Sequence, residues 1–273
     1  MYQSTTYSEK SKLSEGINFN PFPGLRPFGI EESHLFFGRE GQSDEVLNKL
    51  AENKFTAVIG ASGSGKSSLM YCGLIPVLYG GFITEAGSSW KVVSTRPGRG
   101  PIDNLAESLI SDENEELSEK EKYTKKSIAA AVLRSSSLGL VEAVKQLFRF
   151  QEENILILVD QFEELFRYKR SKNDSSSINE SAAFVKLLLE AVQQSEVPIY
   201  VVLTMRSDFI GDCAQYPDLT KEINDSHYLI PQMTREDFRE AILGPVAVGG
   251  GEISPRLVQQ LLNDVGDNQD QLP

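Results

Sequence analysis

The sequence predicts an α/β fold of three layers, with a five-stranded parallel sheet between helices and the start of a helical subdomain after it. Three observations support this prediction. Short apolar runs of strand length recur between segments with the length and spacing of helices. The run ILILV at 155–159 contains no polar residue, which indicates a strand buried on both faces, as in a parallel sheet covered by helices. A glycine-rich loop joins the first apolar run to a helix.

The composition is that of an ordinary globular chain, with 273 residues of which 24% are charged and 40% are hydrophobic. The net charge of −12 opposes contact with nucleic-acid phosphates and with anionic lipid. No apolar run is long enough to cross a bilayer, and the N-terminus lacks the apolar core of a secretion signal. Cys72 and Cys213 fit a reducing compartment as small buried side chains. We therefore expect a cytoplasmic protein that binds neither nucleic acid nor membranes directly.

The chain before the sheet divides into a tail, an arm and a first helix. Residues 1–19 are polar and carry few apolar anchors, so we expect a flexible tail. Residues 20–40 contain three prolines and several aromatic residues, which excludes a regular helix and favours an ordered arm lying across the domain. A helix with Ser43 as its N-cap is expected at 43–53, followed by a strand at 55–61 that ends at the glycine-rich loop.

Helices and strands alternate from the loop onward. Helices are expected at 66–81, where Gly80 and Gly81 close the helix, from near Asp103, at 140–150, at 161–169 and at 182–194. Strands are expected at 90–96, 155–160, 199–206 and 227–231. Two polar segments, 111–127 and 171–181, are interpreted as a solvated surface insertion and a loop. We expect this domain, with its arm, to span residues 20–233.

Two helices without a strand between them are expected after residue 233. The first opens with a capping box formed by Thr234 and Asp237. The second has Ser254 at its N-cap and Pro255 at its first helical position. We interpret residues 234–273 as the beginning of a helical lid subdomain.

The glycine-rich loop carries the spacing G-x-x-x-x-G-K-[ST] of a phosphate-binding P-loop. Backbone N–H groups of such a loop surround the β-phosphate, and the dipole of the following helix adds to the attraction. Lys66 is expected to reach the β- and γ-phosphates, while Ser67 offers its hydroxyl to Mg²⁺. The residues expected to contact the nucleotide here are Gly60, Ala61, Ser62, Gly63, Ser64, Gly65, Lys66, Ser67 and Ser68.

Acidic residues follow the buried strand at 155–160. Asp160 ends that strand, where a carboxylate can hold Mg²⁺ directly or through water. Either Glu163 or Glu164 could orient or deprotonate the attacking water, and Glu163 is preferred. The alternative interpretation is that both glutamates are acids favoured by the dipole at a helix start.

An arginine, Arg206, stands at the end of the strand at 199–206. In a parallel sheet it lies level with the P-loop, where a cation can sense the γ-phosphate and stabilise transition-state charge. The alternative is a structural salt bridge with Asp208. Arg96, at the end of the second strand, is a weaker candidate for the same role.

Together these motifs resemble those of the STAND group, the signal-transduction ATPases with numerous domains. Within that group they look most similar to the prokaryotic novel STAND NTPases, which are often joined to WD-repeat or other repeat sensors. The resemblance covers about residues 20–273. It rests on NPFPGLRPF, FFGRE, GASGSGKSSL, LVDQFEELF, LTMRSDF and the terminal QLP. It implies an AAA+-like P-loop domain that binds ATP or ADP with Mg²⁺.

The resemblance also implies roles for individual residues. Phe37, Gly38 and Arg39 match the arm motif that lies beside the adenine. Leu272 and Pro273 look like the end of a GLPL motif whose proline packs on the base, although Gln271 stands where that motif has glycine. The residues matching the Walker B metal ligand, the second acid and the sensor arginine are Asp160, Glu163 and Arg206.

Members of the STAND group act as switches, which implies slow ATP hydrolysis, a closed ADP state and opening with self-association on ATP exchange. Many take part in defence or programmed-death signalling, and a sensor domain is expected beyond this chain. Two other functions stay open: a mechanical AAA+ ATPase that remodels a substrate, and a nucleotide-binding scaffold without catalysis.

Overall fold

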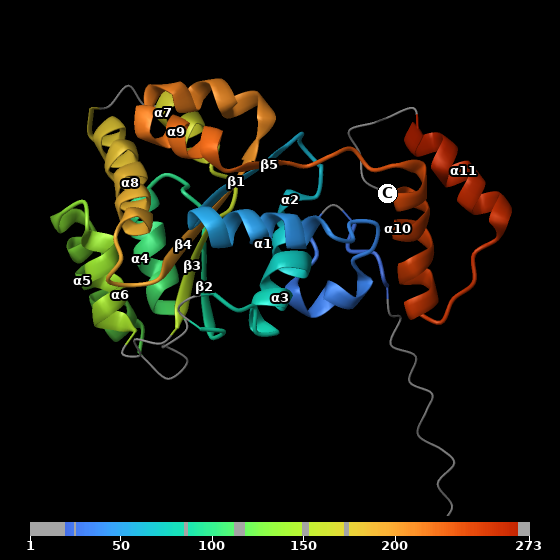
Figure 1. The fold of residues 1–273 in the computed structure, drawn as a ribbon, viewed down its shortest axis with the longest axis horizontal. Helices are drawn as coiled ribbons and strands as arrows, with labels where there is room; N and C mark the ends of the chain where they lie inside the picture. The colour runs from blue at the N-terminus through green and yellow to red at the C-terminus, as the bar shows by residue number, and fades with distance from the viewer. Residues whose placement is uncertain are drawn as a thin grey trace, which may run out of the picture.

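The computed structural model describes residues 20–24, 26–84, 87–111, 118–148, 153–171 and 175–266. Its sheet has five parallel strands in the order β2-β3-β4-β1-β5, with helices on both faces, so the predicted α/β fold class is confirmed (Figure 1). The strands are β1 (Phe55–Gly60), β2 (Trp90–Thr95), β3 (Asn154–Val159), β4 (Ile199–Arg206) and β5 (His227–Leu229). The predicted tail at 1–19 and the terminal residues 271–273 lie outside the described residues.

The strand register decides which side chains meet at the carboxyl edge of the sheet. β4 lies between β1 and β3 and pairs with both. Gly60 at the end of β1 is level with Arg206 at the end of β4, and Val159 is level with Leu203. Asp160, the residue after β3, is therefore brought beside Thr204 of β4. β1 and β3 are buried along their whole length, as their continuous apolar sequences predict.

One face of the sheet is covered by the helix that precedes β1 and by the helix that follows the P-loop. These elements are α1 (Gln42–Asn53), α2 (Lys66–Ser68), the π-helical turn η2 (Leu69–Leu74) and α3 (Ile75–Tyr79). Their apolar residues form one core cluster with side chains from all five strands, including Val58, Leu156 and Val202. Burial of this cluster fixes the start of α2, and so the P-loop, against the sheet.

The opposite face is covered by a larger group of helices. They are α4 (Pro101–Ser111), α5 (Glu119–Ser135), α6 (Gly139–Leu147), α7 (Glu164–Ser171), α8 (Ser175–Gln193), the 3₁₀ segment η3 (Ser207–Gln215) and α9 (Pro217–Asp225). Alternate strand residues such as Ala57, Ile157 and Leu203 point into this second core, as the period of a strand requires. None of the helices in the described ranges combines the length and the apolar character needed to cross a membrane.

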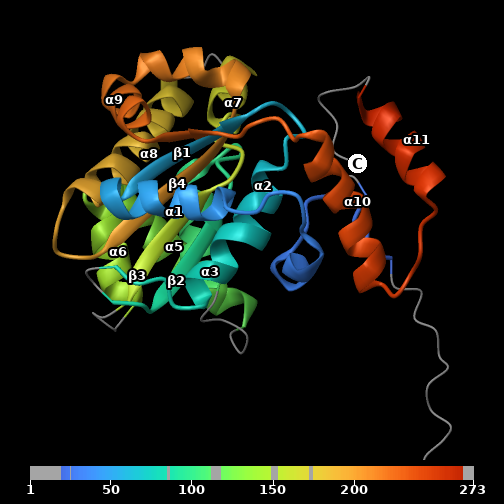
Figure 2. The ribbon, with the colours of Figure 1, turned by 45° about the vertical axis from the view of Figure 1, so that its right-hand side comes forward.

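Two further helices, α10 (Arg235–Val248) and α11 (Pro255–Gly266), lie beside the sheet layers rather than on them (Figures 1 and 2). The predicted capping box of Thr234 and Asp237 is present at the start of α10. The hydroxyl of Ser254 accepts from Leu257 N at 3.3 Å at the start of α11. The two helices share a small core of their own around Ile242, separate from the two sheet cores. The domain boundary at residue 233 stays a prediction.

The arm contains one short 3₁₀ helix, η1 (Ile30–Leu35), and otherwise follows an irregular path. It crosses the helix after the P-loop, because the backbone N–H of Phe28 donates to Ser68 Oγ at 3.3 Å and Cys72 Sγ donates to Gly29 O at 3.1 Å. The arm then reaches α10, which η1 contacts. It thus joins the P-loop helix to α10.

Several element boundaries differ from the sequence prediction. The first helix begins at Gln42 with Gly41 as its N-cap, so the assignment of Ser43 as the cap is wrong. The expected helix at 161–169 begins only at Glu164, because residues 161–163 form a turn with Gln161 at a φ of 57°. The surface insertion and the polar loop are both partly helical, since α5 begins at Glu119 and α8 at Ser175.

Candidate nucleotide site

The P-loop has the backbone shape that its glycines permit. Gly65, the N-cap of α2, has a φ of 82°, a conformation that a side chain disfavours. Gly60 lies so close to the other end of the loop that an added Cβ would be 2.6 Å from Ser64 Oγ. The helix that begins at Lys66 continues through η2 and α3, so its N-terminal N–H groups face the loop. This strand–loop–helix arrangement is a ready-made phosphate site.

The side chain of Lys66 folds back over the loop. Its Nζ donates to Gly60 O at 3.0 Å and to Ala61 O at 2.6 Å. Burial lowers the pKa of this amine, while the nearby Glu163 carboxylate opposes the shift. A phosphate would offer the ammonium a charged acceptor in place of neutral carbonyls, and charge-assisted hydrogen bonds are about twice as strong as neutral ones.

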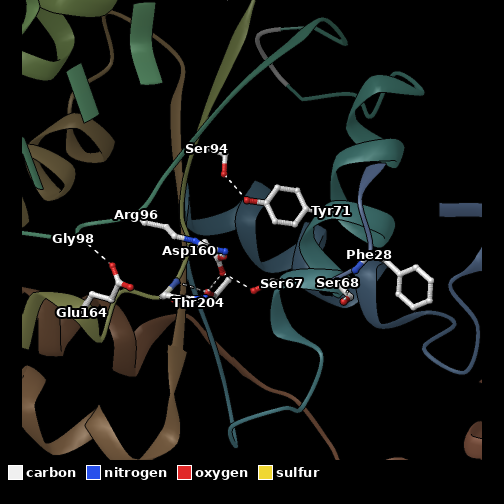
Figure 3. Close-up of polar contacts among 11 residues, drawn as sticks. Phe28, Ser67, Ser68, Tyr71, Ser94, Arg96, Gly98, Asp160, Glu164 and Thr204 are labelled. Carbon is white, nitrogen blue, oxygen red and sulfur yellow. Dashed lines mark hydrogen bonds and ion pairs between the residues drawn. The ribbon is translucent and has the colours of Figure 1, made fainter. Parts of the chain in front are cut away.

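Asp160 is the centre of the polar contacts at the carboxyl edge (Figure 3). Its side chain is only 1% exposed. Ser67 Oγ donates to Oδ1 at 2.8 Å, and Thr204 Oγ1 donates to the same oxygen at 2.7 Å. Arg96 donates to Oδ2 from Nη2 at 2.9 Å and from Nε at 3.2 Å. The structure thus places Arg96 on the aspartate.

The donor set around Asp160 fits Mg²⁺. The Ser67 hydroxyl and the Asp160 carboxylate lie within 2.8 Å of one another and offer only oxygen, which this hard ion prefers. Mg²⁺ is usually held by one or two protein groups together with substrate phosphates and water. Ser67 and Asp160 are therefore the residues that would hold the ion, beside the start of the P-loop helix.

The two glutamates after Asp160 have different surroundings. Glu163 is 5% exposed, and its Oε2 accepts from the backbone N–H of Arg206 at 3.4 Å. Burial raises the pKa of Glu163, and the neighbouring Lys66 and Arg206 only partly oppose this shift. Glu164 turns the other way, because its Oε2 accepts from Gly98 N at 3.0 Å in the loop after β2 (Figure 3). The geometry favours Glu163 as the group that faces the P-loop.

Arg206 ends β4 beside Gly60, level with the P-loop as expected. Its guanidinium forms a two-point contact with Asp208, from Nε at 3.1 Å and from Nη2 at 2.6 Å. The side chain is 35% exposed and also lies over the ring of Phe209, at 5.7 Å. Hydrogen bonding to Asp208 raises the pKa of Arg206. The salt bridge named as the structural alternative is therefore present.

The three arm residues 37–39 lie between the P-loop and α10. The ring of Phe37 packs on α10 so closely that an added Cβ at Gly244 would be 2.4 Å from it. Gly38 has a φ of 79° and abuts the backbone of Asp237. Arg39 is 7% exposed and donates to Ser64 O of the P-loop at 2.9 Å and to Pro231 O, ahead of α10, at 2.8 Å. Desolvation lowers its pKa.

The family follows from the sequence as a whole. The model of the family described as Novel STAND NTPase 1 matches residues 21–273, which is almost the entire chain. The chain belongs to this family. It is thus a nucleotide-binding NTPase of the P-loop class, and the resemblance that its motifs suggested is confirmed. No curated protein matches the sequence.

Solved structures share the fold of this STAND NTPase at low identity. The Walker-type ATPase PABY2304 of Pyrococcus abyssi is 15% identical, with a TM-score of 0.52, over 88% of this chain and 65% of its own. The ORC1 protein of Aeropyrum pernix, solved in complex with DNA, is 15% identical with a TM-score of 0.52, over 85% and 56%. The ADP form of the Aeropyrum pernix ORC2 protein is 11% identical with a TM-score of 0.54, over 92% and 62%. The chain therefore spans less than two thirds of each.

Sequence reasoning missed one contributor to the site of the STAND NTPase, Thr204, and expected a different contact for another, Arg96. Thr204 is 1% exposed and donates to Asp160, and its hydroxyl also accepts from Gln161 N at 3.0 Å. A polar residue inside the apolar run of β4 is the signal that could have found it. Arg96, the weaker candidate for the γ-phosphate sensor, donates instead to the carboxylate of Asp160. Pro273 lies outside the described residues.

Proposed function

We propose that this STAND NTPase is a nucleotide-dependent switch that binds ATP with Mg²⁺ and hydrolyses it slowly. In this proposal bound ADP stabilises a closed form of the protein. Exchange of ADP for ATP opens the lid and allows self-association. Hydrolysis then returns the switch to the closed form. The membership in a family of NTPases supports nucleotide turnover, and the contacts of the arm support the coupling to the lid.

The observation that carries the proposal is the double contact of Arg39. One guanidinium donates to the carbonyl of Ser64 in the P-loop and to the carbonyl of Pro231, which precedes α10. A ligand can shift a conformational equilibrium only by binding its two states with different affinity. A movement of the P-loop on binding nucleotide changes the distance between these two carbonyls. Arg39 thus supplies a route by which the nucleotide senses the position of the lid.

The buried acids give the site its proposed chemistry. Glu163, whose pKa burial raises, is the proposed base that takes a proton from the attacking water. Mg²⁺, held by Ser67 and Asp160, would neutralise phosphate charge when bound. Lys66 and Arg206 are proposed to hold and sense the β- and γ-phosphates. The salt bridge between Arg206 and Asp208 must open for that role, which is consistent with slow turnover.

The wider setting is proposed on the resemblance alone. We expect a cytoplasmic protein with a C-terminal sensor domain beyond this chain, acting in prokaryotic defence or stress signalling. We expect neither nucleic acid nor membrane as a direct partner, because the net charge of −12 repels both.

The first test is to identify the nucleotide that the purified protein carries. The protein is denatured, and the released nucleotide is quantified by chromatography. Lys66→Ala should abolish retention, while Lys221→Ala, which removes an exposed lysine of α9, serves as the matched control. Near-stoichiometric ADP in the wild type and the control, but not in Lys66→Ala, supports the switch.

Three further results would contradict the proposal or favour another function. An empty wild-type site combined with rapid, constitutive turnover contradicts a switch held by ADP. A stable hexamer formed with ATP, detected by mass measurement, favours the remodelling ATPase instead. A wild type that binds nucleotide without hydrolysing it, and a Glu163→Gln protein that behaves in the same way, favour the scaffold without catalysis.

A further inference from the structure

The hydrogen-bonding capacity of Asp160 is fully used within the chain. An ionised carboxylate offers about four lone-pair positions. Oδ1 accepts from the hydroxyls of Ser67 and Thr204, and Oδ2 accepts twice from the guanidinium of Arg96. A metal ion or its bound water can therefore approach this carboxylate only if one donor leaves.

The three donors differ in how easily they can leave. Ser67 and Thr204 have short side chains fixed on the P-loop helix and on β4, and Thr204 is 1% exposed. A hydroxyl also has lone pairs, so Ser67 can face a metal ion and still donate its proton to Asp160. Arg96 follows the edge strand β2 on a long side chain that is 48% exposed. Its departure needs no movement of the backbone.

Space to receive the arginine lies on its outer side. A cleft of about 420 Å³ opens between η2 and α4 and is lined by Arg96 itself. Its other walls include the hydroxyls of Tyr71, Ser94 and Ser108 and the carboxylate of Glu107. Thr95, also in the wall, has a buried hydroxyl with no hydrogen-bond partner. The guanidinium therefore has a cleft with polar walls beside it, and Figure 3 shows two of the lining side chains, Tyr71 and Ser94, whose hydroxyls hydrogen-bond one another at 2.8 Å.

We infer that Arg96 is a built-in counter-ion that competes with Mg²⁺ for Asp160. Without the metal, the guanidinium pairs with a carboxylate that is only 1% exposed, and a buried charge without a partner is costly. When Mg²⁺ arrives with the nucleotide, two cations beside one carboxylate repel each other, and Arg96 moves into the cleft. Arg96 is thus a positioning residue that sets the Mg²⁺ concentration needed for nucleotide binding. This inference rests on the proposed function, because it assumes that Mg²⁺ and nucleotide bind at the P-loop.

The test measures the Mg²⁺ dependence of nucleotide binding, not turnover. A fluorescent ADP analogue is titrated with Mg²⁺ in the wild type, Arg96→Ala and Arg96→Lys. Arg239→Ala, which removes an exposed arginine of α10, is the control for charge. Competition predicts that Arg96→Ala lowers the half-saturating Mg²⁺ concentration about tenfold, the effect of about 1.4 kcal/mol. Arg96→Lys, which keeps the charge but loses the two-point contact, should fall between the two.

Thermal unfolding provides a second measurement, in which the effect of Arg96→Ala depends on whether Mg²⁺ and ADP are present. In excess EDTA, Arg96→Ala should melt at a lower temperature than the wild type, because Asp160 loses its counter-ion. With saturating Mg²⁺ and ADP, the difference should disappear. A purely structural role for Arg96 predicts instead that Arg96→Ala lowers stability equally in both conditions and raises the Mg²⁺ requirement, and that result overturns the inference. If the wild type shows no Mg²⁺-dependent nucleotide binding, the proposed function fails first.

Discussion

The contact between Gly38 and the lid gives a prediction whose magnitude follows from the structure. Gly38 has a φ of 79°, and an added Cβ would lie 2.4 Å from the carbonyl oxygen of Asp237 and 2.8 Å from the Met233 side chain. Gly41, three residues later, also has a φ of 79°, but nothing lies within 4 Å of its added Cβ. The variants Gly38→Ala and Gly41→Ala therefore share a backbone cost and differ in the clash with α10.

The backbone cost is roughly 1–2 kcal/mol for placing a side chain in the left-handed region. Overpacking adds typically about 1–3 kcal/mol, and it applies to Gly38→Ala alone. If α10 stays in place, Gly38→Ala should be less stable than Gly41→Ala by this second amount. For a domain of this size, each kcal/mol lowers the melting temperature by about 2–4 °C. If α10 moves away instead, the clash is relieved at the expense of the closed lid.

The assay that separates these cases combines melting with ADP release. Release of a fluorescent ADP analogue should be faster for Gly38→Ala than for Gly41→Ala, by roughly tenfold for each 1.4 kcal/mol that opens the lid. A lower melting temperature or faster release, specific to Gly38→Ala, agrees with an arm held tightly against the lid. Equal melting temperatures and equal release rates for the two variants would refute the reasoning.

Three further predictions concern the charged groups of the site. Glu163→Gln should lower the rate of ATP hydrolysis, measured by phosphate release, about 10²–10⁴-fold while nucleotide binding is retained. Glu164→Gln should mainly remove the contact with Gly98 and leave the rate within a few-fold of the wild type. Burial raises the pKa of Glu163 in the folded state, so its contribution to stability is complete below the unfolded pKa near 4.3 and is lost as the pH rises through the folded value. Denaturant titrations should therefore show the stability of Glu163→Gln rising relative to that of the wild type as the pH increases above about 4. Arg39→Ala should release ADP faster and melt lower than Arg39→Lys, because lysine can still reach one carbonyl; identical behaviour of the two would exclude a role for the double contact.

The parts of the fold that the sequence predicted well are those that depend on neighbours along the chain. The continuous apolar runs of β1, β3 and β4 report burial on both faces, whatever packs against them. The capping box of Thr234 and Asp237 is equally local. A similar signal at Ser118 and Glu121 begins α5, but its dense charges were interpreted as a surface insertion. A capping box can therefore mark the start of a helix inside a densely charged segment.

The parts that could not be predicted depend on strand register and on turns. Arg96 and Asp160 are 64 residues apart, and they meet only because β2 and β3 pair with Thr95 level with Val159. The separate directions of Glu163 and Glu164 depend on the turn that holds Gln161 at a φ of 57°. The spacing of residues in the sequence predicts neither the register nor the turn. It therefore could not decide whether Glu163 or Glu164 is the catalytic base.

The two acceptors of Arg39 determine which substitutions can disrupt the proposed switch. Both of its acceptors, at residues 64 and 231, are main-chain carbonyls, so a change of side chain at either position leaves the acceptor in place. The contact is sensitive instead to the path of the backbone and to the shape of the guanidinium, whose planar fork reaches two acceptors at once. A link of this kind reports the separation of the P-loop from the segment before α10 rather than the charge of either. It follows that substitutions at Ser64 should change phosphate contacts without uncoupling the lid, whereas substitution of Arg39 should uncouple the lid while the phosphate contacts remain.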